Sequence, residues 1–322
     1  MKFISKYLIM AEANNRKLLE LRPLPRETLK SLRKFYRIGL TYSSNALEGN
    51  SLTETETKVV IEDGLTINGK PLRDIYEAVG HAKAYDHIHK LAKNKELTET
   101  DILKLHKLFY SQMDFKNAGH YRTVPVFISG SKYTVTPPKN IPTEMAKFVQ
   151  WYNKNEQKMN PVEFAARVHK KFVFIHPFID GNGRMARLLM NLTLLRNEYT
   201  ITIIPAIRRM DYVAALENAH TKEDVFVDFI ANCVVETQND LLRLLKNSGI
   251  KAEDVSKANS TKKNVQESLF TEIKEHPGQN APTLSAKLFL SLRTTQRYLK
   301  TLINDEKIEF RGVPKNGGYW QK

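Results

Sequence analysis

"HPFIDGNGRMAR", residues 176–187, is the stretch that decides how this chain folds and what it does. His176 ends an apolar run, and Pro177 disfavours helix for the residue before it, so the chain should leave a helix at this point. From Arg184 onward, apolar residues recur at helical spacing. We therefore expect a loop between two helices, with the second helix beginning near Arg184.

The polar groups of this loop suit the binding of a polyphosphate. Gly181 and Gly183 can adopt backbone angles denied to other residues, and they leave amides uncovered ahead of a helix N-terminus, which is a ready anion site. Arg184 and Arg187 are spaced i, i+3, so both can face one phosphate chain. This part of the pattern predicts a nucleotide or phosphate site.

A base and a metal carboxylate complete the pattern. Asp180 lies four residues after His176, close enough to share a substrate with it. Asp180 would carry Mg²⁺, and His176 would take a proton from an incoming hydroxyl. Taken singly, these are a helix-end histidine and an N-cap aspartate, but their combination with the glycines and arginines favours phosphoryl-transfer chemistry.

Composition bounds the class of protein. The chain has 322 residues, of which 41% are hydrophobic, enough for a sizeable core. Its single cysteine, Cys233, allows no internal disulfide and indicates a reducing compartment. The N-terminus is too charged for a signal peptide, and no apolar run reaches about 18 residues, so a soluble cytoplasmic protein without a membrane segment is expected. The net charge of +15 favours polyanionic partners.

Helical patterns dominate the chain to about residue 246. Helix is expected over 24–48, ended by Gly49, and again after a cap at Thr53 or Thr55. Asn160 and Pro161 begin a helix that reaches the motif. The exception is "VPVFISGSKYTVTPP" in segment 122–138, where β-branched and aromatic residues flank a turn signal and predict a β-hairpin.

The C-terminal region is predicted to be a separate domain. Residues 247–263 are polar and read as a linker. Residues 264–322 show three short helices followed by strand, turn and strand, the order of a winged helix-turn-helix domain. Residues 262–322 hold 11 Lys or Arg and 6 Asp or Glu, a net charge of +5. The predicted DNA contacts are Arg293, Thr294, Gln296 and Arg297 in the third helix and Lys315 in the wing turn. Protein contact or internal regulation is the alternative use of such a domain.

The loop motif resembles the signature of the Fic family, H-x-F-x-D/E-G-N-G-R-x-x-R, and matches it at every specified position. The resemblance implies a mainly helical catalytic core over 51–246, preceded by an N-terminal helical region over 1–50 and carrying a β-hairpin flap above the site. It implies transfer of AMP from ATP, with Mg²⁺, to a Ser, Thr or Tyr hydroxyl of a target protein and of the chain itself, releasing pyrophosphate.

The resemblance also assigns roles to the residues of the loop. His176 would be the general base, and Asp180 would bind Mg²⁺. Asn182 and the amides of Gly181 and Gly183 would hold the α-phosphate. Arg184 and Arg187 would hold the outer phosphates. Relatives that act as kinases carry a lysine where this chain has Gly183, so AMP transfer is favoured.

A second match lies upstream, in "SSNALEGN", residues 43–50. It resembles the family's inhibitory motif, S/T-x-x-x-E-G/N, with Ser44, Glu48 and Gly49 at the specified positions. A glutamate at a helix end can pair with Arg187 and remove one phosphate holder. ATP would then bind with its γ-phosphate misplaced and its α-phosphate out of line for attack.

Further contacts follow from the same resemblance. The flap would hold target backbone as an added strand, and Thr134 and Val135 would contact the nucleotide. Tyr212 would stack on adenine, with His220 nearby. A homodimer is expected from the behaviour of relatives.

Two other functions stay open at this stage. One is a DNA-binding regulator whose pocket senses ATP. The other is a hydrolase of the same fold that removes AMP, with Glu48 positioning a water molecule. The intact His176 is expected for transfer and is not needed for sensing, so it favours the adenylyltransferase.

Overall fold

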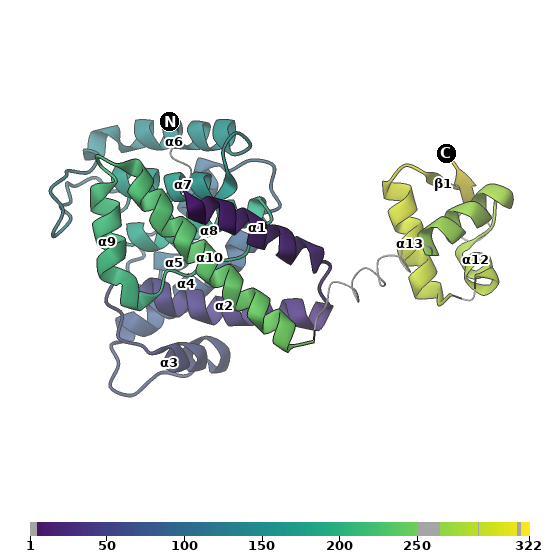
Figure 1. Cartoon of the computed structure of the whole chain (residues 1–322), viewed down its shortest axis with the longest axis horizontal. Coiled ribbons are helices and arrows are strands. Elements are labelled where there is room, and N and C mark those ends of the chain that lie inside the picture. The colour runs from purple at the N-terminus through teal and green to yellow at the C-terminus, as the bar shows by residue number, and fades with distance from the viewer. Residues whose placement is uncertain (1–4, 250–264, 289, 314–316) are drawn as a thin grey trace. The chain divides into compact units, whose positions relative to one another are not determined.

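The computed structural model describes residues 5–249, 265–288, 290–313 and 317–322. The chain divides into two compact units: the larger comprises Met1–Glu20 and Leu24–Ser248, and the smaller comprises Leu21–Pro23 and Gly249–Lys322. Helices make up most of both units (Figure 1), so the expectation of a mainly helical protein is confirmed. In the part of the chain so described, no helix combines the length and apolar character that a membrane crossing needs.

The larger unit consists of helices joined by short connections and by one long loop. In chain order these helices are α1 (Lys6–Glu20), α2 (Arg26–Ala46), α3 (Glu54–Lys58), η1 (Val59–Asp63), α4 (Leu72–Leu91), α5 (Glu99–Tyr110), η2 (Pro138–Asn140), α6 (Ile141–Asn155), α7 (Pro161–Ile175), α8 (Asn182–Arg196), η3 (Ala206–Arg208), α9 (Arg209–Asn218) and α10 (Glu223–Asn247).

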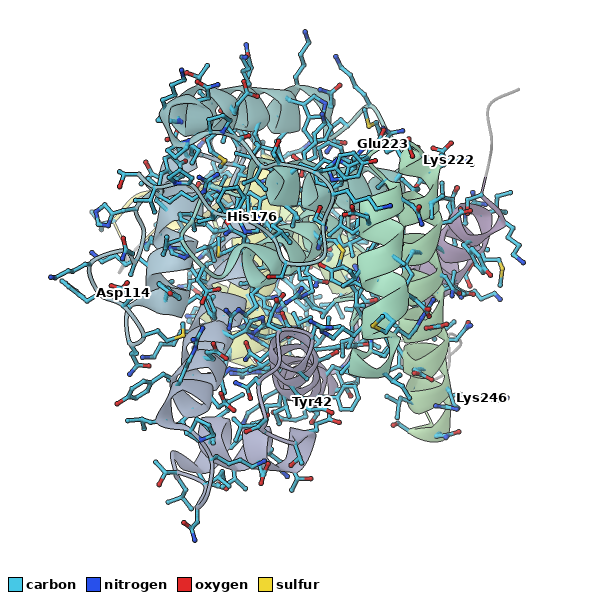
Figure 2. The ribbon with its side chains drawn as sticks, turned by 90° about the vertical axis from the view of Figure 1, so that its left-hand side faces the viewer. Tyr42, Asp114, His176, Lys222, Glu223 and Lys246 are labelled. Atoms are coloured by element: carbon cyan, nitrogen blue, oxygen red, sulfur yellow. The ribbon has the colours of Figure 1, made fainter. Side chains whose placement is uncertain are left out.

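Helix α8 is the buried centre of this unit. Helices α2, α4 and α7 pack against it, and α10 lies outside α7 and beside α1 (Figure 1). Of the 15 residues of α8, 12 are buried, which is expected only for a helix enclosed on most of its faces. The loop 176–181 leads into α8, and His176 lies near the middle of the face shown in Figure 2.

Local signals in the sequence explain several helix ends. Gly49, at φ 95°, follows the end of α2 in a conformation that favours glycine. Thr53 caps α3 and forms a capping box with Glu56. Asn160 caps α7, whose first residue is Pro161. Helix α8 begins at Asn182, two residues before the position expected from the apolar spacing.

The β-hairpin predicted for 122–138 is wrong, because no residue of that segment is in a strand. The Arg122 side chain donates to the carbonyls of Val124 and Thr136, and so joins the two arms of the loop in place of backbone amides. Pro125 and Pro137 have no amide hydrogen to give to a strand ladder. Residues 122–137, called the flap segment below, therefore form a loop with a turn at its tip.

The smaller unit has its own core. A helix over 265–275 precedes α12 (Ala281–Lys287), α13 (Leu292–Asn304) and the antiparallel strands β1 (Ile308–Arg311) and β2 (Gly318–Gln321). Apolar side chains from these elements pack together, among them Leu269, Leu284, Leu299 and Ile308. The order of elements is the predicted one, and its assignment as a winged helix stays a prediction. From residue 250 on, the predicted linker lies outside the described residues.

Candidate active site

His176 caps α7 in a left-handed backbone conformation. Its φ and ψ are 53° and 59°, a region that non-glycine residues rarely adopt and that is concentrated at functional sites. Its amide still donates to the carbonyl of Phe172 at 3.0 Å. Pro177 follows and ends the helix, as the sequence predicts.

The His176 ring is prepared to act as a base. Its Nδ1 lies 3.2 Å from the carbonyl oxygen of Val173, which only accepts, so Nδ1 carries the hydrogen and Nε2 keeps a free lone pair. Burial lowers the pKa of His176, and this effect outweighs the Val173 hydrogen bond, which raises it. The ring is therefore neutral at pH 7, the state that a general base needs.

The loop after His176 is fixed from inside. The Asn182 side chain accepts from the amide of Phe178 at 2.9 Å and donates to its carbonyl at 2.8 Å. His106 stacks on the Phe178 ring, with centroids 3.7 Å apart. Because His106 Nδ1 accepts from the amide of Gly119, its Nε2 donates to the carbonyl of Asp180, 3.2 Å away. Asn182 was expected to hold the α-phosphate. In this structure its side-chain amide instead binds the backbone of Phe178 and so fixes the shape of the loop.

Gly181 and Gly183 each have a neighbouring side chain in the space that a Cβ would occupy. Gly181 has φ 80°, and a Cβ there would lie 2.7 Å from a ring carbon of Phe109. A Cβ at Gly183, in the first turn of α8, would overlap the carboxylate oxygen Oε1 of Glu48. Larger residues at either position would move a neighbour, so the loop keeps its backbone close to the helix start.

Asp180 belongs to a ring of four alternating charges. Its Oδ2 lies 2.8 Å from Nη2 of Arg73, and its Oδ1 lies 3.3 Å from Nη2 of Arg184. Both arginines also contact Oε1 of the buried Glu77, at 3.1 Å and 2.7 Å. Each carboxylate thus lies between two guanidinium groups, and both oxygens of Asp180 are engaged.

The residues present fit a metal ion that arrives with a nucleotide. Within the described residues, no three His, Cys, Asp or Glu side chains cluster as metal ligands. Asp180 offers one carboxylate, and its side chain is 36% exposed. Mg²⁺ is commonly held by one or two carboxylates together with substrate phosphates and water.

Arg187 is enclosed and engages a partner with each nitrogen. It is 1% exposed. Its Nε donates to Oγ of Ser44 at 2.9 Å, and its Nη2 donates to the Ser44 carbonyl at 2.7 Å and to Oε1 of Glu48 at 2.8 Å. Its Nη1 donates to the hydroxyl of Tyr212 at 3.2 Å. The structure therefore contains the Glu48–Arg187 contact that the sequence predicts.

Glu48 reaches Arg187 from just beyond the end of α2. Its amide donates to the carbonyl of Asn45, in the last turn of that helix. Burial raises the pKa of Glu48, but Arg187, by its charge and hydrogen bond, brings that pKa below the ordinary value. The pair is therefore ionised at neutral pH.

Tyr212 supports Arg187 from the other side. Its hydroxyl accepts from Arg187 and lies 3.0 Å from Nε2 of His169. Burial holds the pKa of His169 well below its usual value, so that ring is neutral. Tyr212 is 6% exposed, an enclosed position unlike the open one expected for a residue that stacks on adenine.

His220 is stacked between two rings. Phe174 lies against one side at 3.8 Å between centroids, and Tyr133 of the flap segment lies against it at 3.6 Å. Thr134 and Val135 follow Tyr133, the first exposed and the second half-buried. Thr134 and Val135, the predicted nucleotide contacts of the flap, therefore adjoin the residue that stacks on His220, which lies just after the end of α9.

The flap segment is attached at its base and at its tip. At the base, Arg122 donates through Nε to the carbonyl of His176 at 2.8 Å and also holds Thr136. At the tip, the Glu217 carboxylate accepts from the hydroxyl of Ser131 and the amide of Lys132, both at 2.8 Å. The catalytic loop, the flap segment and α9 are therefore linked.

The predicted DNA contacts lie in the smaller unit. Arg293, Gln296 and Arg297 are exposed on α13, and Thr294 is half-buried. Lys315 lies outside the described residues.

Sequence reasoning missed several residues of the site, notably Arg73, Glu77, His106 and Arg122. Arg73 and Glu77 are spaced i, i+4 on α4, a detectable signal for a helical ion pair but not for contact with Asp180. Nothing local connects His106 or Arg122 with the loop, because both contacts span long stretches of chain.

A sequence profile of the Fic/DOC family matches residues 96–194. The solved structure of Fic-1 (residues 134–508) from C. elegans is 30% identical, with a TM-score of 0.69, and the match covers 76% of this chain and 73% of that one. This chain belongs to the Fic/DOC family. Its matching region includes the loop, α7 and most of α8.

Curated members of the family extend the comparison. Protein adenylyltransferase Fic of Nematostella vectensis is 35% identical over 200 residues, covering 61% of this chain and 46% of that protein. The Drosophila grimshawi protein of the same name is 36% identical, covering 61% and 41%. The chain thus matches less than half the length of these relatives. A Fic family protein from Desulfovibrio desulfuricans G20, 22% identical with a TM-score of 0.60, shares the fold over 99% of this chain and 97% of its own.

Proposed function

We propose that this Fic/DOC protein is a protein adenylyltransferase that Glu48 holds inactive. One observation carries the proposal: the most enclosed cation beside the loop, Arg187, is paired with Glu48 at 2.8 Å, while the His176 ring stands neutral with Nε2 free. The site has the base that the reaction needs, and one of its phosphate holders is already engaged.

The transfer reaction assigns a task to each group. Nε2 of His176 takes the proton of a Ser, Thr or Tyr hydroxyl, the hydroxyl oxygen attacks the α-phosphorus of ATP, and pyrophosphate leaves. The amides at the start of α8 and the guanidinium groups of Arg184 and Arg187 stabilise negative charge on the phosphates. Mg²⁺ bound at Asp180 would neutralise charge on the outer phosphates.

Inhibition follows from competition for Arg187. While Glu48 holds Nη2, that nitrogen cannot bind the γ-phosphate, and the polyphosphate loses the anchor that would align its α-phosphorus with the attacking oxygen. The ion pair is local and noncovalent, so a change in the end of α2 suffices to release it.

The test is the mass of the purified protein after incubation with Mg²⁺ and ATP. Wild type should gain little AMP, Glu48→Gly should gain the mass of one or more AMP groups, and Glu48→Gly/His176→Ala should gain none. Glu48→Gln, which keeps the size and removes the charge, should behave like Glu48→Gly. If no variant gains AMP but wild type removes it from a modified protein, the hydrolase with a Glu48-positioned water is the better assignment.

A second function is favoured by the smaller unit. We propose that α13 binds DNA, since its exposed face carries Arg293, Gln296 and Arg297 in a region of net charge +5. Fluorescence anisotropy with a labelled duplex at several salt concentrations tests this. Arg293→Ala/Arg297→Ala should weaken binding and reduce the salt dependence by about two phosphate contacts, while Lys274→Ala, on the helix over 265–275, should change little. Absence of salt-dependent binding would assign the unit to protein contact.

A further inference from the structure

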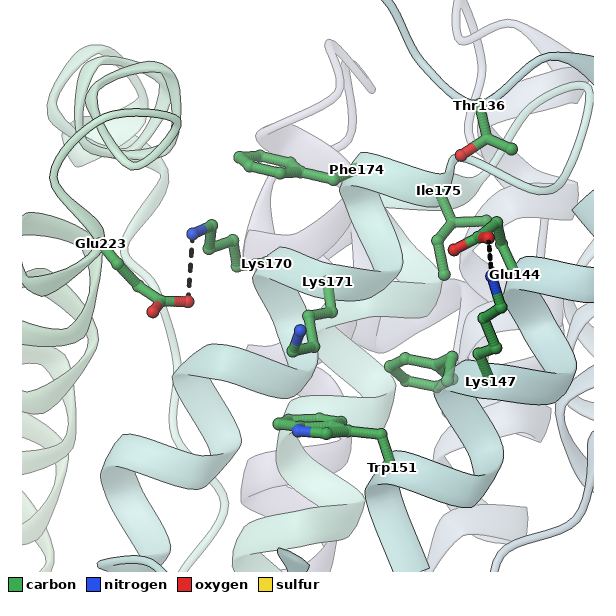
Figure 3. A pocket seen from close by; sticks show the side chains of 10 residues that line it. Thr136, Glu144, Lys147, Trp151, Lys170, Lys171, Phe174, Ile175 and Glu223 are labelled. Atoms are coloured by element: carbon green, nitrogen blue, oxygen red, sulfur yellow. Dashed lines mark hydrogen bonds and ion pairs between the residues drawn. The ribbon is translucent and has the colours of Figure 1, made fainter. Parts of the chain in front are cut away.

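A second cavity lies beside the catalytic loop and apart from the phosphate-binding groups. It has a volume of about 490 Å³ and opens between α6, α7 and the start of α10 (Figure 3). Three lysines and three aromatic rings dominate its lining: Lys147, Lys170, Lys171, Phe148, Trp151 and Phe174. None of the loop residues from Asp180 to Arg187 lines it. The cavity is therefore separate from the residues expected to hold the phosphates.

Of the three lysines that line the cavity, two are paired with carboxylates and one is not. Lys147 pairs with Glu144 at 2.8 Å, and Lys170 pairs with Glu223 at 3.0 Å. Lys171 has no carboxylate within ion-pair distance among the described residues, and its Nζ lies 4.7 Å from the centroid of the Trp151 ring. The lining thus carries one unmatched positive charge above an aromatic surface.

Lys170 can also bind a ligand, because its partner Glu223 has a second cationic partner. Its other oxygen binds Arg167, which also pairs with Glu163. Because Glu223 would keep Arg167 as a partner, Lys170 can turn toward a ligand without leaving that carboxylate unpaired. Two ammonium groups on adjacent residues of α7 can therefore meet one anion.

The cavity is close to the reacting group. Ile175, which lines it, directly precedes His176. Thr136, which also lines the cavity, has its carbonyl bound by the same Arg122 side chain that holds the carbonyl of His176. A polypeptide with a hydroxyl at His176 needs only a few more residues to reach this cavity.

Resting on the proposed function, we propose that this cavity binds an acidic side chain of the target protein, near the hydroxyl that is modified. The carboxylate contacts Lys171 and Lys170, and an apolar neighbour in the target packs on Trp151 and Phe174. The volume suits one or two side chains, and the single unmatched charge suits one carboxylate. The cavity would thus select targets by an acidic residue next to an apolar one.

The test measures binding without transfer. The probe is a glycine–alanine peptide with one Phe-Glu pair and no hydroxyl, compared with the same peptide carrying Phe-Gln, and no nucleotide is added. The full chain carries Trp320→Phe, so that Trp151 is its only tryptophan. The Phe-Glu peptide should change Trp151 emission and bind about tenfold more tightly than the Phe-Gln peptide. Lys171→Ala should remove that difference, and Lys154→Ala, an exposed lysine of α6, should retain it.

Three results would overturn the proposal: equal binding of the two peptides, equal effects of Lys171→Ala and Lys154→Ala, or a change of Trp151 emission with inorganic phosphate but not with the Phe-Glu peptide. Thermal unfolding of each variant confirms that it is folded. Because the assay needs no AMP transfer, peptide selectivity without any AMP gain in Glu48→Gly would contradict the proposed function and leave the acidic-residue site standing.

Discussion

The carboxylate of Glu48 occupies space that only a glycine at position 183 leaves open. The oxygen that accepts from Arg187 is the atom that a Cβ on Gly183 would overlap. Gly183, in the first turn of α8, and Glu48, just beyond the end of α2, are therefore in close contact, although they lie far apart in the sequence. Under the proposed function, this space would hold either the Glu48 carboxylate or a phosphate of the nucleotide.

This fit predicts a coupling that is measurable in protein stability. Gly183→Ala should lower the free energy of unfolding by about 1–3 kcal/mol in wild type, because the added methyl group displaces the Glu48 carboxylate. In a Glu48→Gly background, the same substitution should no longer destabilise the protein, because the carboxylate is absent and alanine favours helix more than glycine does. Urea unfolding of wild type, Gly183→Ala, Glu48→Gly and the double variant gives the coupling free energy between the two positions. An equal cost in both backgrounds would mean that the two residues do not compete for space.

The state of His176 predicts the pH dependence of transfer. Burial lowers the pKa of this histidine, so the neutral, base-competent form persists to more acidic pH than for an ordinary histidine. In Glu48→Gly, the midpoint of the decline of kcat/KM for AMP transfer toward acid should lie below pH 6.5, the ordinary pKa of histidine. A midpoint at or above pH 6.5 would show that the pKa is not lowered and would contradict the assignment.

Arg122 is predicted to hold the flap segment and the catalytic loop together. Arg122→Lys cannot span the carbonyls of Val124, Thr136 and His176 with one ammonium group, so kcat/KM should fall by about tenfold or more. Trypsin should also cut after Lys132 faster than in wild type, a readout independent of activity. Arg243→Lys, an exposed residue of α10, is the matched control and should alter neither.

Arg73 is predicted to compete with a metal ion for Asp180. Its Nη2 lies 2.8 Å from Oδ2 of that carboxylate, and its side chain is 63% exposed, so it can withdraw when a cation arrives. Arg73→Ala should therefore bind Mn²⁺ more tightly than wild type in the presence of ADP, by about three- to tenfold. Electron paramagnetic resonance of free Mn²⁺ measures this. Weaker binding in Arg73→Ala would show that the arginine assists the metal site.

The sequence predicted the conformation of residues 176–187 better than it predicted the side chains that pack around Arg187. Residues 176–187 are contiguous, and their conformation depends on Pro177, on glycines and on a helix start, which are local effects. The Glu48–Arg187 contact was predicted only because two motifs were read together. Arg187 also contacts Tyr212, whose hydroxyl lies against His169. No local sequence pattern predicts these contacts, because they depend on how α7, α8 and α9 pack.

The flap segment shows where a local pattern misleads. Its β-branched and aromatic residues favour strands, but two prolines remove amide donors and the Arg122 side chain takes the carbonyls that a ladder would use. The aromatic residue Tyr133 is turned to His220 and not to a cross-strand neighbour. Such long-range contacts override strand propensity, which is itself strongly dependent on context.

The most direct measurement compares the affinities of ATP and ADP for wild type and Glu48→Gly by calorimetry. If Glu48 denies Arg187 to the γ-phosphate, wild type should bind ATP no more tightly than ADP, whereas Glu48→Gly should favour ATP by about tenfold or more. Glu48→Gln should resemble Glu48→Gly. The same ratio of ATP to ADP affinity in all three proteins would contradict the proposal that Glu48 and the γ-phosphate compete for Arg187.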